Sequence, residues 1–235
     1  MNRRDFAGCV RLGLALPLFA SSARADERKK TESEAKWAPR SAVSVDEIVS
    51  HLEARYGQAT TFRADFKRHI LGMPYGTRRG MTGTVTFVLP SKMSWRYTST
   101  GDRVVSDATW VKVYERGNKR LYELELAKTL YPAALSFLIA QGKLRQNFKF
   151  TRPGPKYKSS DGMHLLIAEP LLVSGVYDRL LFYIDAQSYQ MQSVLIRDLQ
   201  GNRTRFDFIA GKVNGSVPES EFSFTPPFGT QLIRL

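Results

Sequence analysis

Three histidines are the side chains best suited to bind a metal ion. His51, His69 and His164 lie far apart in the sequence, and no two of them have the short spacing that zinc sites use. The single cysteine, Cys9, lies near the N-terminus and has no second cysteine to pair with. The sequence therefore predicts no metal centre and no disulfide.

Aspartates at predicted turns are the best candidates for acid–base catalysis. Carboxylates at such positions usually accept hydrogen bonds from nearby backbone amides. The chain has no G-x-S-x-G, no phosphate-binding loop, no H-E-x-x-H and no dinucleotide-binding glycine pattern. We expect no catalysed reaction and no cofactor, although a hidden carboxylate pair, and hence a hydrolase, is an open alternative. The aspartates concerned are Asp102, Asp107, Asp161 and Asp185.

Aromatic and basic residues alternate at Trp95, Arg96 and Tyr97, a pattern with two interpretations. Stacking aromatics beside cations can bind single-stranded nucleic acid. Alternation also marks a strand whose aromatic residues face inward and whose basic residue faces solvent. We favour the strand interpretation and expect no nucleic-acid partner.

The surrounding segment, 83–114, extends this alternation. Val85, Phe87 and Leu89 share one parity, and Met93 and Trp95 continue it after a Pro-Ser break. A period of two predicts two strands with one apolar face, which must be covered by a core, a partner or a lipid. The opposite parity is expected to face solvent and contains Thr84, Thr86, Lys92, Ser94 and Arg96.

Two helices are predicted beside the strands. Ser44 and Glu47 form a capping box before a helix over Val45–Tyr56, with Gly57 at its end. A second helix is expected within Leu126–Gln141, where Pro132 fits only the first turn.

Short alternating runs separated by turn residues predict that strands dominate the rest of the chain. The fold class is therefore mainly β with two helices (α+β), an antiparallel sheet that curls toward a barrel. The expected strands are Thr61–Leu71, Gly83–Leu89, Lys92–Thr98, Arg103–Ser106, Thr109–Tyr114, Arg120–Glu123, Asn147–Thr151, Met163–Glu169, Arg179–Asp185, Gln190–Arg197, Thr204–Ala210 and a short one in Glu221–Phe228.

The N-terminus has the features of an export signal. Arg3 and Arg4 precede an apolar stretch over 10–20, and Ala23-Arg24-Ala25 forms a cleavage site. We expect removal of residues 1–25, by the general or the twin-arginine route. Residues 26–43 are polar and predicted to be a disordered lead-in, and residues 44–235 form one domain.

Composition limits the class of partner. With 43% hydrophobic residues among 235, the chain can bury a sizeable core, and its net charge is +13. Loss of the signal removes four basic residues and one acidic residue, which lowers the charge to +10. A diffuse basic surface suits anionic partners without selecting among them.

Several motifs in order resemble a known family over roughly residues 44–233. They are the capped helix, Phe62-x-x-x-Phe66-Lys67, Gly83 through Pro90 to Trp95-Arg96-Tyr97, Val105-Ser106-Asp107, Trp110 to Tyr114 and the ending Phe222 to Gly229. This arrangement is similar to the periplasmic carriers of outer-membrane lipoproteins, the LolA-type family.

The resemblance implies an incomplete antiparallel barrel of about eleven strands with a helical lid, and a cavity for lipoprotein acyl chains. It implies a periplasmic protein without cofactor or catalysis, and we expect a monomer. The implied partners are acylated lipoproteins, an ATP-driven extraction complex in the inner membrane and an outer-membrane acceptor. A lipid-binding or stress-sensing regulatory module of the same superfamily is the alternative.

Two positions depart from the family pattern. Members typically have arginine immediately before the proline matched by Pro90, where it holds the lid, and this chain has Leu89. Ala108 replaces a usual glycine. Leucine contributes only packing, so the resemblance supports lipid binding more directly than the opening of the lid.

The inward parity gives the expected site. We expect the cavity to be lined by Phe66, Val85, Phe87, Leu89, Met93, Trp95, Tyr97, Phe182, Ile184 and Phe206. We expect the lid to contribute Ile48, Val49, Leu52, Leu135 and Leu138.

Overall fold

The computed structural model describes residues 43–71, 78–107, 109–129, 131–139, 143–154 and 162–234. The expected export signal and the lead-in up to residue 42 lie outside the described residues, as do Ala108 and Asp161. The described residues belong to the unit from Val43 onward.

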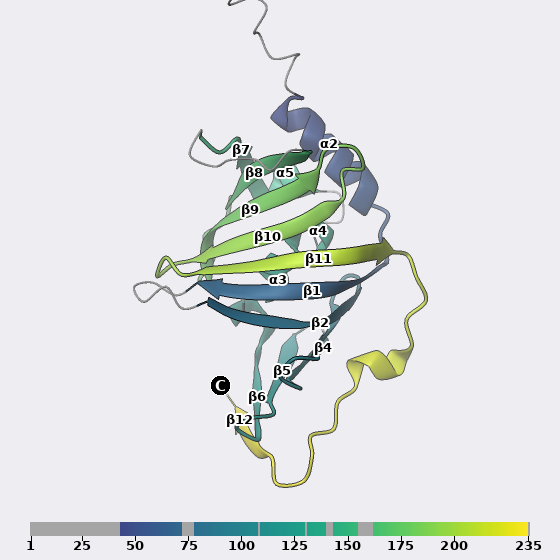
Figure 1. Cartoon of the computed structure of the whole chain (residues 1–235), viewed down its shortest axis with the longest axis vertical. Helices are drawn as coiled ribbons and strands as arrows, with labels where there is room; N and C mark the ends of the chain where they lie inside the picture. The colour runs from purple at the N-terminus through teal and green to yellow at the C-terminus, as the bar shows by residue number, and fades with distance from the viewer. Residues whose placement is uncertain are drawn as a thin grey trace, which may run out of the picture. The chain divides into compact units, whose positions relative to one another are not determined.

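Twelve strands of the described chain form one sheet in the order β12-β6-β5-β4-β3-β2-β1-β11-β10-β9-β8-β7. The sheet bends around the short helices α3 and α4, which lie behind β11 and β1 in Figure 1. The strands are β1 (Thr61–Leu71), β2 (Arg78–Val88), β3 (Lys92–Tyr97), β4 (Arg103–Asp107), β5 (Trp110–Glu115), β6 (Arg120–Glu125), β7 (Phe148–Thr151), β8 (Met163–Pro170), β9 (Tyr177–Asp185), β10 (Met191–Asp198), β11 (Arg203–Val213) and β12 (Gln231–Arg234).

The open, mostly antiparallel sheet expected from the sequence is confirmed, with one addition. The strand β12 pairs with β6 in parallel, whereas the other pairs are antiparallel. The strand predicted in Glu221–Phe228 is wrong, because Glu219–Phe222 forms the 3-10 helix η2 and no strand follows until β12. Pro226 and Pro227 lack the N–H groups that a ladder requires.

The first helix, α2 (Val45–Tyr56), has the predicted bounds. The Ser44 hydroxyl oxygen accepts from the Glu47 N–H at 3.1 Å, which satisfies one of the unpaired donors of the first turn. Its buried face consists of Ile48, Val49, Leu52 and Tyr56, at helical spacing.

The single second helix predicted within Leu126–Gln141 is wrong. The segment contains the 3-10 helix η1 (Leu126–Lys128) and the α-helical turns α3 (Tyr131–Ala134) and α4 (Ser136–Ile139), and α5 (Leu144–Asn147) follows. Leu135 N–H bonds to the Pro132 carbonyl, and Leu138 N–H bonds to the Leu135 carbonyl. These i to i+3 bonds interrupt the α-helical ladder and let the buried segment follow the curved sheet.

A C-terminal strap, residues 216–230, runs from β11 along the outside of the sheet to β12 (Figure 1). Its helix η2 contacts β3 and β4. The Glu221 carboxylate accepts from Ser94 Oγ at 2.5 Å and from Arg96 Nε at 2.9 Å. Arg103 Nη2 donates to the Glu221 carbonyl oxygen at 2.5 Å.

The strap corrects the expectation that the outer parity faces solvent. Ser94 is fully buried and Thr86 is 2% exposed, and Arg103 is 5% exposed. Burial lowers the pKa of Arg103 to about 10, with repulsion from Arg96 adding to the shift and Glu221 opposing it. The Glu221 carboxylate therefore supplies the counter-charge for a buried guanidinium.

We expect Glu221→Gln to lower the free energy of unfolding by about 2 kcal/mol at pH 7, because it removes charge-assisted bonds to partly buried partners. Burial alone would raise the pKa of Glu221, but the hydrogen bonds from Arg96 and Ser94 outweigh it and lower the pKa below 4.5. The carboxylate therefore stabilises the fold above the unfolded-state pKa, and the contribution is lost as the pH falls through the folded-state pKa. Urea unfolding at pH 7, 5 and 3.5 measures this, and the difference in stability between the two chains should shrink as the pH falls.

Glu219→Gln is the matched control, because Glu219 pairs with Lys92 on the same strap and its side chain is 79% exposed. Its loss should stay below about 0.5 kcal/mol. Equal losses in the two variants would contradict a specific role for the Glu221 carboxylate.

Candidate lipid-binding site

The concave wall of the sheet is a continuous aromatic cluster. Phe66 on β1 lies with its ring centroid 4.9 Å from that of Trp95 and 5.1 Å from that of Tyr97, both on β3. Trp95 in turn lies 5.1 Å from Phe206 on β11. Cross-strand pairing aligns Val85 with Trp95, so inward side chains of neighbouring strands share one face.

A glycine makes room for the central ring of this wall. Gly83 stands opposite both Phe66 and Tyr97 in the ladder. A Cβ at this position would lie 1.9 Å from the Arg96 carbonyl oxygen and 3.0 Å from the Phe66 ring. Only glycine fits here, and its missing side chain leaves space for the Phe66 ring.

Four helices cover this wall, and we call α2, α3, α4 and α5 the cover. Phe137 of α4 is fully buried and contacts Tyr56 of α2 at 4.8 Å between ring centroids. Its ring also lies 5.8 Å from Phe62 and 5.9 Å from Phe208, both on the wall. Phe137 therefore connects the two helices to the sheet through dispersion and burial of apolar area.

Polar contacts hold two parts of the cover to each other. Arg145 at α5 donates from its backbone N–H to Glu53 at 3.1 Å and from Nη2 to the Ser50 hydroxyl at 2.8 Å. Glu53 also forms an ion pair with the Arg145 guanidinium. The helices α2 and α5 are thus joined by directional bonds, whereas their contact with the wall is mainly apolar.

Nine of the ten residues expected to line the cavity are buried in one cluster with the five expected lid residues. Leu89 is the exception, since it lies in the turn after β2, is only partly buried and packs at the edge of the cluster. The nine are at most 3% exposed and the lid residues at most 1%. The inner space is therefore occupied by the cover itself.

Two pockets open beside the helix α3, and both are lined by Pro132. One, of about 470 Å³, lies against the turn ends of β2 and β3 and is lined by Phe87, Met93 and Leu126 among others. The other, of about 270 Å³, lies against β7 and β9 and includes Phe148 and Tyr177. The segment around Pro132 thus separates two openings between the cover and the wall.

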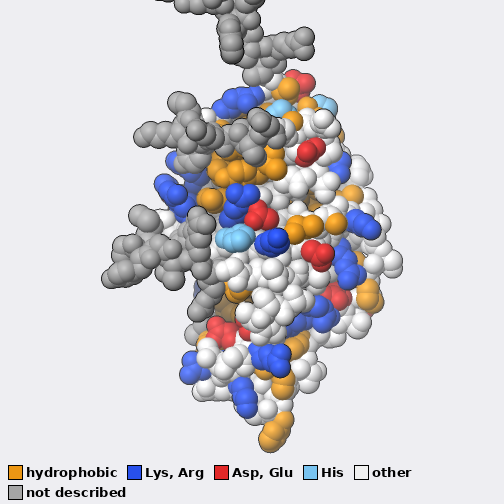
Figure 2. Space-filling view, viewed as in Figure 1, with side chains coloured by type: hydrophobic (Ala, Val, Ile, Leu, Met, Phe, Trp, Pro, Cys, Tyr) orange, Lys and Arg blue, Asp and Glu red, His pale blue; other side chains and the backbone are white. Residues whose placement is uncertain are grey.

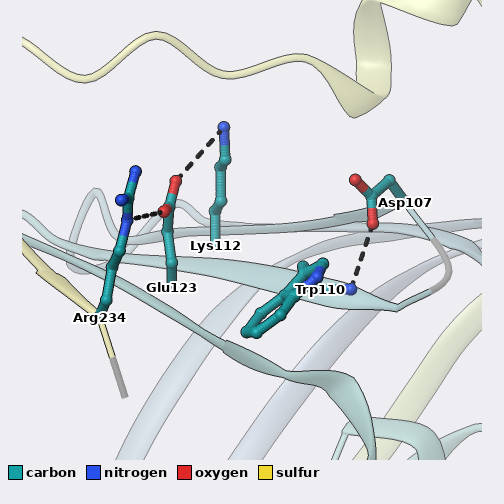
Figure 3. A pocket seen from close by; sticks show the side chains of 5 residues that line it. All are labelled: Asp107, Trp110, Lys112, Glu123 and Arg234. Atoms are coloured by element: carbon teal, nitrogen blue, oxygen red, sulfur yellow. Dashed lines mark hydrogen bonds and ion pairs between the residues drawn. The ribbon is translucent and has the colours of Figure 1, made fainter.

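A third pocket, of about 550 Å³, lies on the opposite face of the sheet near β12. Figure 3 shows Glu123 between Lys112 and Arg234, with N–O distances of 3.7 Å and 3.1 Å. Asp107 accepts from the Trp110 N–H at 3.2 Å. Lys112, Glu123 and Arg234 are paired with one another, and Asp107 is charged as well, which makes this pocket unsuited to an acyl chain.

The aspartates have the structural roles that the sequence indicates. The Asp102 carboxylate accepts from the Arg116 N–H, that of Asp107 from the Thr109 N–H, and that of Asp185 from the Gln187 N–H. Hydrogen bonds from Ser188 lower the pKa of Asp185. Asp161 lies outside the described residues.

Two of the three histidines lie beside the ring of Tyr189. His51 stacks on it at 3.9 Å, and His164 lies 5.7 Å away. His69 is 3.4 Å from the Asp207 carboxylate. The described residues contain no group of three or more His, Cys, Asp or Glu side chains placed to hold a metal ion.

Sequence reasoning missed a polar group at the wall. Arg68 follows Phe66 with the same parity on β1, and its Nη1 donates to Tyr97 Oη at 3.1 Å. Tyr97 Oη lies 3.4 Å from Tyr131 Oη on α3. Burial raises the pKa of Tyr131 well above 10, so its hydroxyl stays protonated at neutral pH. The signal was available, since a charged residue on an otherwise apolar parity is unusual.

Within the described part of the chain, no helix has both the length and the apolar character needed to cross a membrane.

Comparison with known proteins gives a consistent picture. The family described as outer membrane lipoprotein carrier protein LolA matches residues 57–225. An outer-membrane lipoprotein carrier protein of Ralstonia nicotianae is 26% identical over 192 residues, which cover 79% of this chain and 86% of that protein. One of Cupriavidus taiwanensis is 24% identical over 204 residues, covering 85% and 92%.

Among solved structures, a LolA superfamily protein of Nitrosomonas europaea aligns with 78% of this chain and 99% of its own, at 11% identity and a TM-score of 0.43. The match at 57–225 includes the strands β1 to β11, which supply the wall, and the cover helices α3 to α5, whereas α2 precedes it. The chain belongs to the family of the outer membrane lipoprotein carrier protein LolA.

Proposed function

We propose that this protein is a periplasmic carrier that shields lipoprotein acyl chains and ferries lipoproteins from the inner to the outer membrane. Residues 1–25 act as the cleaved export signal, 26–43 as a linker and 44–235 as the carrier domain. The observation that supports this most is the division of the interior into two separate surfaces, an aromatic wall and a cover that meets it mainly through apolar side chains.

The energetics explain why a carrier is needed. Exposing one chain of about sixteen carbons to water costs on the order of 13 kcal/mol, at about 0.8 kcal/mol per methylene. Acyl chains that replace the cover on the wall exchange one apolar contact for another, so the net cost is small. A binding state of this kind releases its ligand readily, which delivery requires.

The proposed partners follow from the same energetics. Extraction from a bilayer is uphill, and the sequence has no phosphate-binding loop. We therefore assign the energy input to an ATP-driven complex in the inner membrane and the delivery to an outer-membrane acceptor. The carrier acts as a monomer and uses its basic surface for docking. Figure 2 shows Lys and Arg side chains spread over one face of the molecule.

Native mass spectrometry of the protein purified from its own periplasm tests the proposal. A co-purifying acylated protein supports a carrier. A protein partner without acyl chains would instead support a regulatory module of the same superfamily and would contradict the carrier function.

Two tryptophans on opposite faces allow the acyl position to be measured. Trp95 is fully buried in the wall, whereas Trp110 is 48% exposed on the outer face. The third tryptophan, Trp37, is replaced so that one fluorophore remains. In a chain with Trp37→Phe and Trp110→Phe, we expect a synthetic lipopeptide with brominated acyl chains to quench the fluorescence of Trp95 strongly, because bromine quenches at contact range. Fluorescence titration measures this directly.

The matched control carries Trp37→Phe and Trp95→Phe and keeps Trp110. With uptake of the lipopeptide verified by gel filtration, its fluorescence should stay unchanged. Quenching of Trp110 together with an unaffected Trp95 would place the acyl chains outside the wall and contradict the proposed site.

The cover and the ligand compete for one surface, so weakening the cover should favour the ligand. We expect Phe137→Ala to lower the free energy of unfolding by about 3–5 kcal/mol, because it leaves a cavity among Tyr56, Phe62 and Phe208. The same variant should bind the lipopeptide about tenfold more tightly or better, since 1.4 kcal/mol corresponds to tenfold in affinity. Urea unfolding and Trp95 quenching measure the two effects.

Leu181→Ala is the control for general destabilisation. Leu181 is 4% exposed but lies outside the core cluster, on the other face of β9. It should lose stability without any gain in affinity. Weaker lipopeptide binding by Phe137→Ala would mean that Phe137 contacts the ligand rather than competes with it.

A further inference from the structure

Among the buried side-chain polar atoms of the described residues that make no hydrogen bond, two donors belong to the wall. Trp95 Nε1 and Arg68 Nε are buried and make no hydrogen bond in the structure. Both side chains pack on Phe206, since the Trp95 ring lies 5.1 Å from the Phe206 centroid and the Arg68 guanidinium carbon lies 5.5 Å from it. A buried donor without a partner costs free energy, so two of them on one ring point to a bound acceptor.

The charge of Arg68 also lacks a counter-ion. Within the described chain it forms no ion pair, and its Nη1 donates to the phenol oxygen of Tyr97. Arg103, whose side chain is also shielded from solvent, has Glu221 beside it at 3.6 Å. A partly buried cation among aromatic rings is therefore suited to an anionic or strongly dipolar oxygen.

We propose that Arg68 and Trp95 form a recognition site for the oxygen end of an acyl chain, either the carboxylate of a free fatty acid or the carbonyl of an acyl ester. Both donors would point at this oxygen while the hydrocarbon tail lies on the aromatic wall. The proposal rests on the carrier function above and adds the chemistry that fixes the orientation of the chain.

The position of the site agrees with this chemistry. Arg68 is aligned with Met81 on β2 and Phe206 on β11, two buried members of the wall. Tyr131 of the cover lies over the same region, with its ring 5.3 Å from Trp95. Tyr131 immediately precedes Pro132, which lines both openings beside α3. Of these two openings, the one beside Tyr177 lies at the end of the sheet that holds Arg68, because Tyr177 is aligned with Asp198 and Arg203 with Leu71. An acyl chain entering there would meet Arg68 at that end of the wall.

An acyl oxygen fits better than other polar groups. The free groups, Arg68 Nε and Trp95 Nε1, are both donors, so a hydroxyl or amine would have to act as acceptor only. The surroundings are apolar, which disfavours a group as heavily hydrated as a phosphate with two charges. A carboxylate or ester carbonyl accepts two bonds and carries its own apolar tail.

Equilibrium dialysis of the mature chain with radiolabelled laurate and with methyl laurate tests the proposal. We expect Arg68→Met to weaken binding of laurate about tenfold, the loss typical of one charge-assisted hydrogen bond. Arg68→Lys keeps the charge but lacks Nε. Its affinity for laurate should lie between that of the unaltered chain and that of Arg68→Met. A loss for laurate alone supports recognition of a free fatty acid, and an equal loss for the methyl ester supports recognition of the acyl carbonyl.

Arg63→Met is the matched control, because Arg63 lies on the same strand with an exposed side chain and opposite parity. It should bind both ligands as the unaltered chain does. If Arg68→Met and Arg68→Lys fold and bind both ligands with unchanged affinity, the recognition site is refuted while the carrier function stands. If the unaltered chain binds neither ligand, the acyl-binding wall itself fails, and the inference fails with it.

Discussion

The structure depends on one constraint, namely that the aromatic wall of the sheet cannot face water. Phe66, Trp95 and Phe206 together with their neighbours bury large apolar areas, each worth several kcal/mol when removed from water. Some apolar surface must cover them at all times. In the described state α2 to α5 do so, and in the proposed loaded state the acyl chains take their place. The wall thus requires an apolar surface to cover it, and either the helices or acyl chains can supply that surface.

The two faces of the sheet are held in different ways, and the difference fits this exchange. On the outer face, Glu221 ties the strap to β3 and β4 through Ser94, Arg96 and Arg103. Such bonds have strict geometry and fix one arrangement. Between the wall and the cover, directional bonds are few, such as the Met191 N–H to Tyr56 Oη bond of 2.9 Å. The shape of the sheet is therefore fixed from outside, while its inner contacts remain exchangeable.

The sequence predicted well those elements whose pattern is local. Alternation gave β1 to β3 within a few residues, and the Ser44 cap gave α2 its bounds. It failed where tertiary contacts decide. Residues 133–138 are all buried, so their apolar side chains show no period that separates one helix from two turns. The alternation predicts that Ser94 is exposed, but the strap covers it. The pairing of β12 with β6 could not be predicted from local pattern either, because β6 lies over a hundred positions earlier in the chain.

The candidate site was likewise predictable where strand parity decides and not where tertiary contacts decide. The parity rule predicted the inward direction of nine of the ten residues expected at the cavity, because a strand fixes the direction of its side chains, and these nine are buried in the core. Their contact with acyl chains stays a prediction. The parity rule misplaced Leu89, which lies in a turn where parity no longer holds. Arg68 carried a usable signal on that parity, but its meaning depends on Tyr97 of β3 and Tyr131 of α3, which only the folded chain brings together.

The short helices of the cover explain how the wall can be released. Helical turns of four residues are not stable alone in water, so α3 and α4 owe their form to packing on the sheet. A ligand bound to the wall would remove that packing, and α3 and α4 would then lose the contacts that stabilise their helical form. By contrast, α2 is a longer helix with an N-cap, and Arg145 of α5 donates a hydrogen bond to it. We therefore expect α2 to keep its helical structure if it moves. In the proposed loaded state, the cover would combine one element that moves as a unit with a segment that rearranges, and the two openings beside Pro132 lie along that segment.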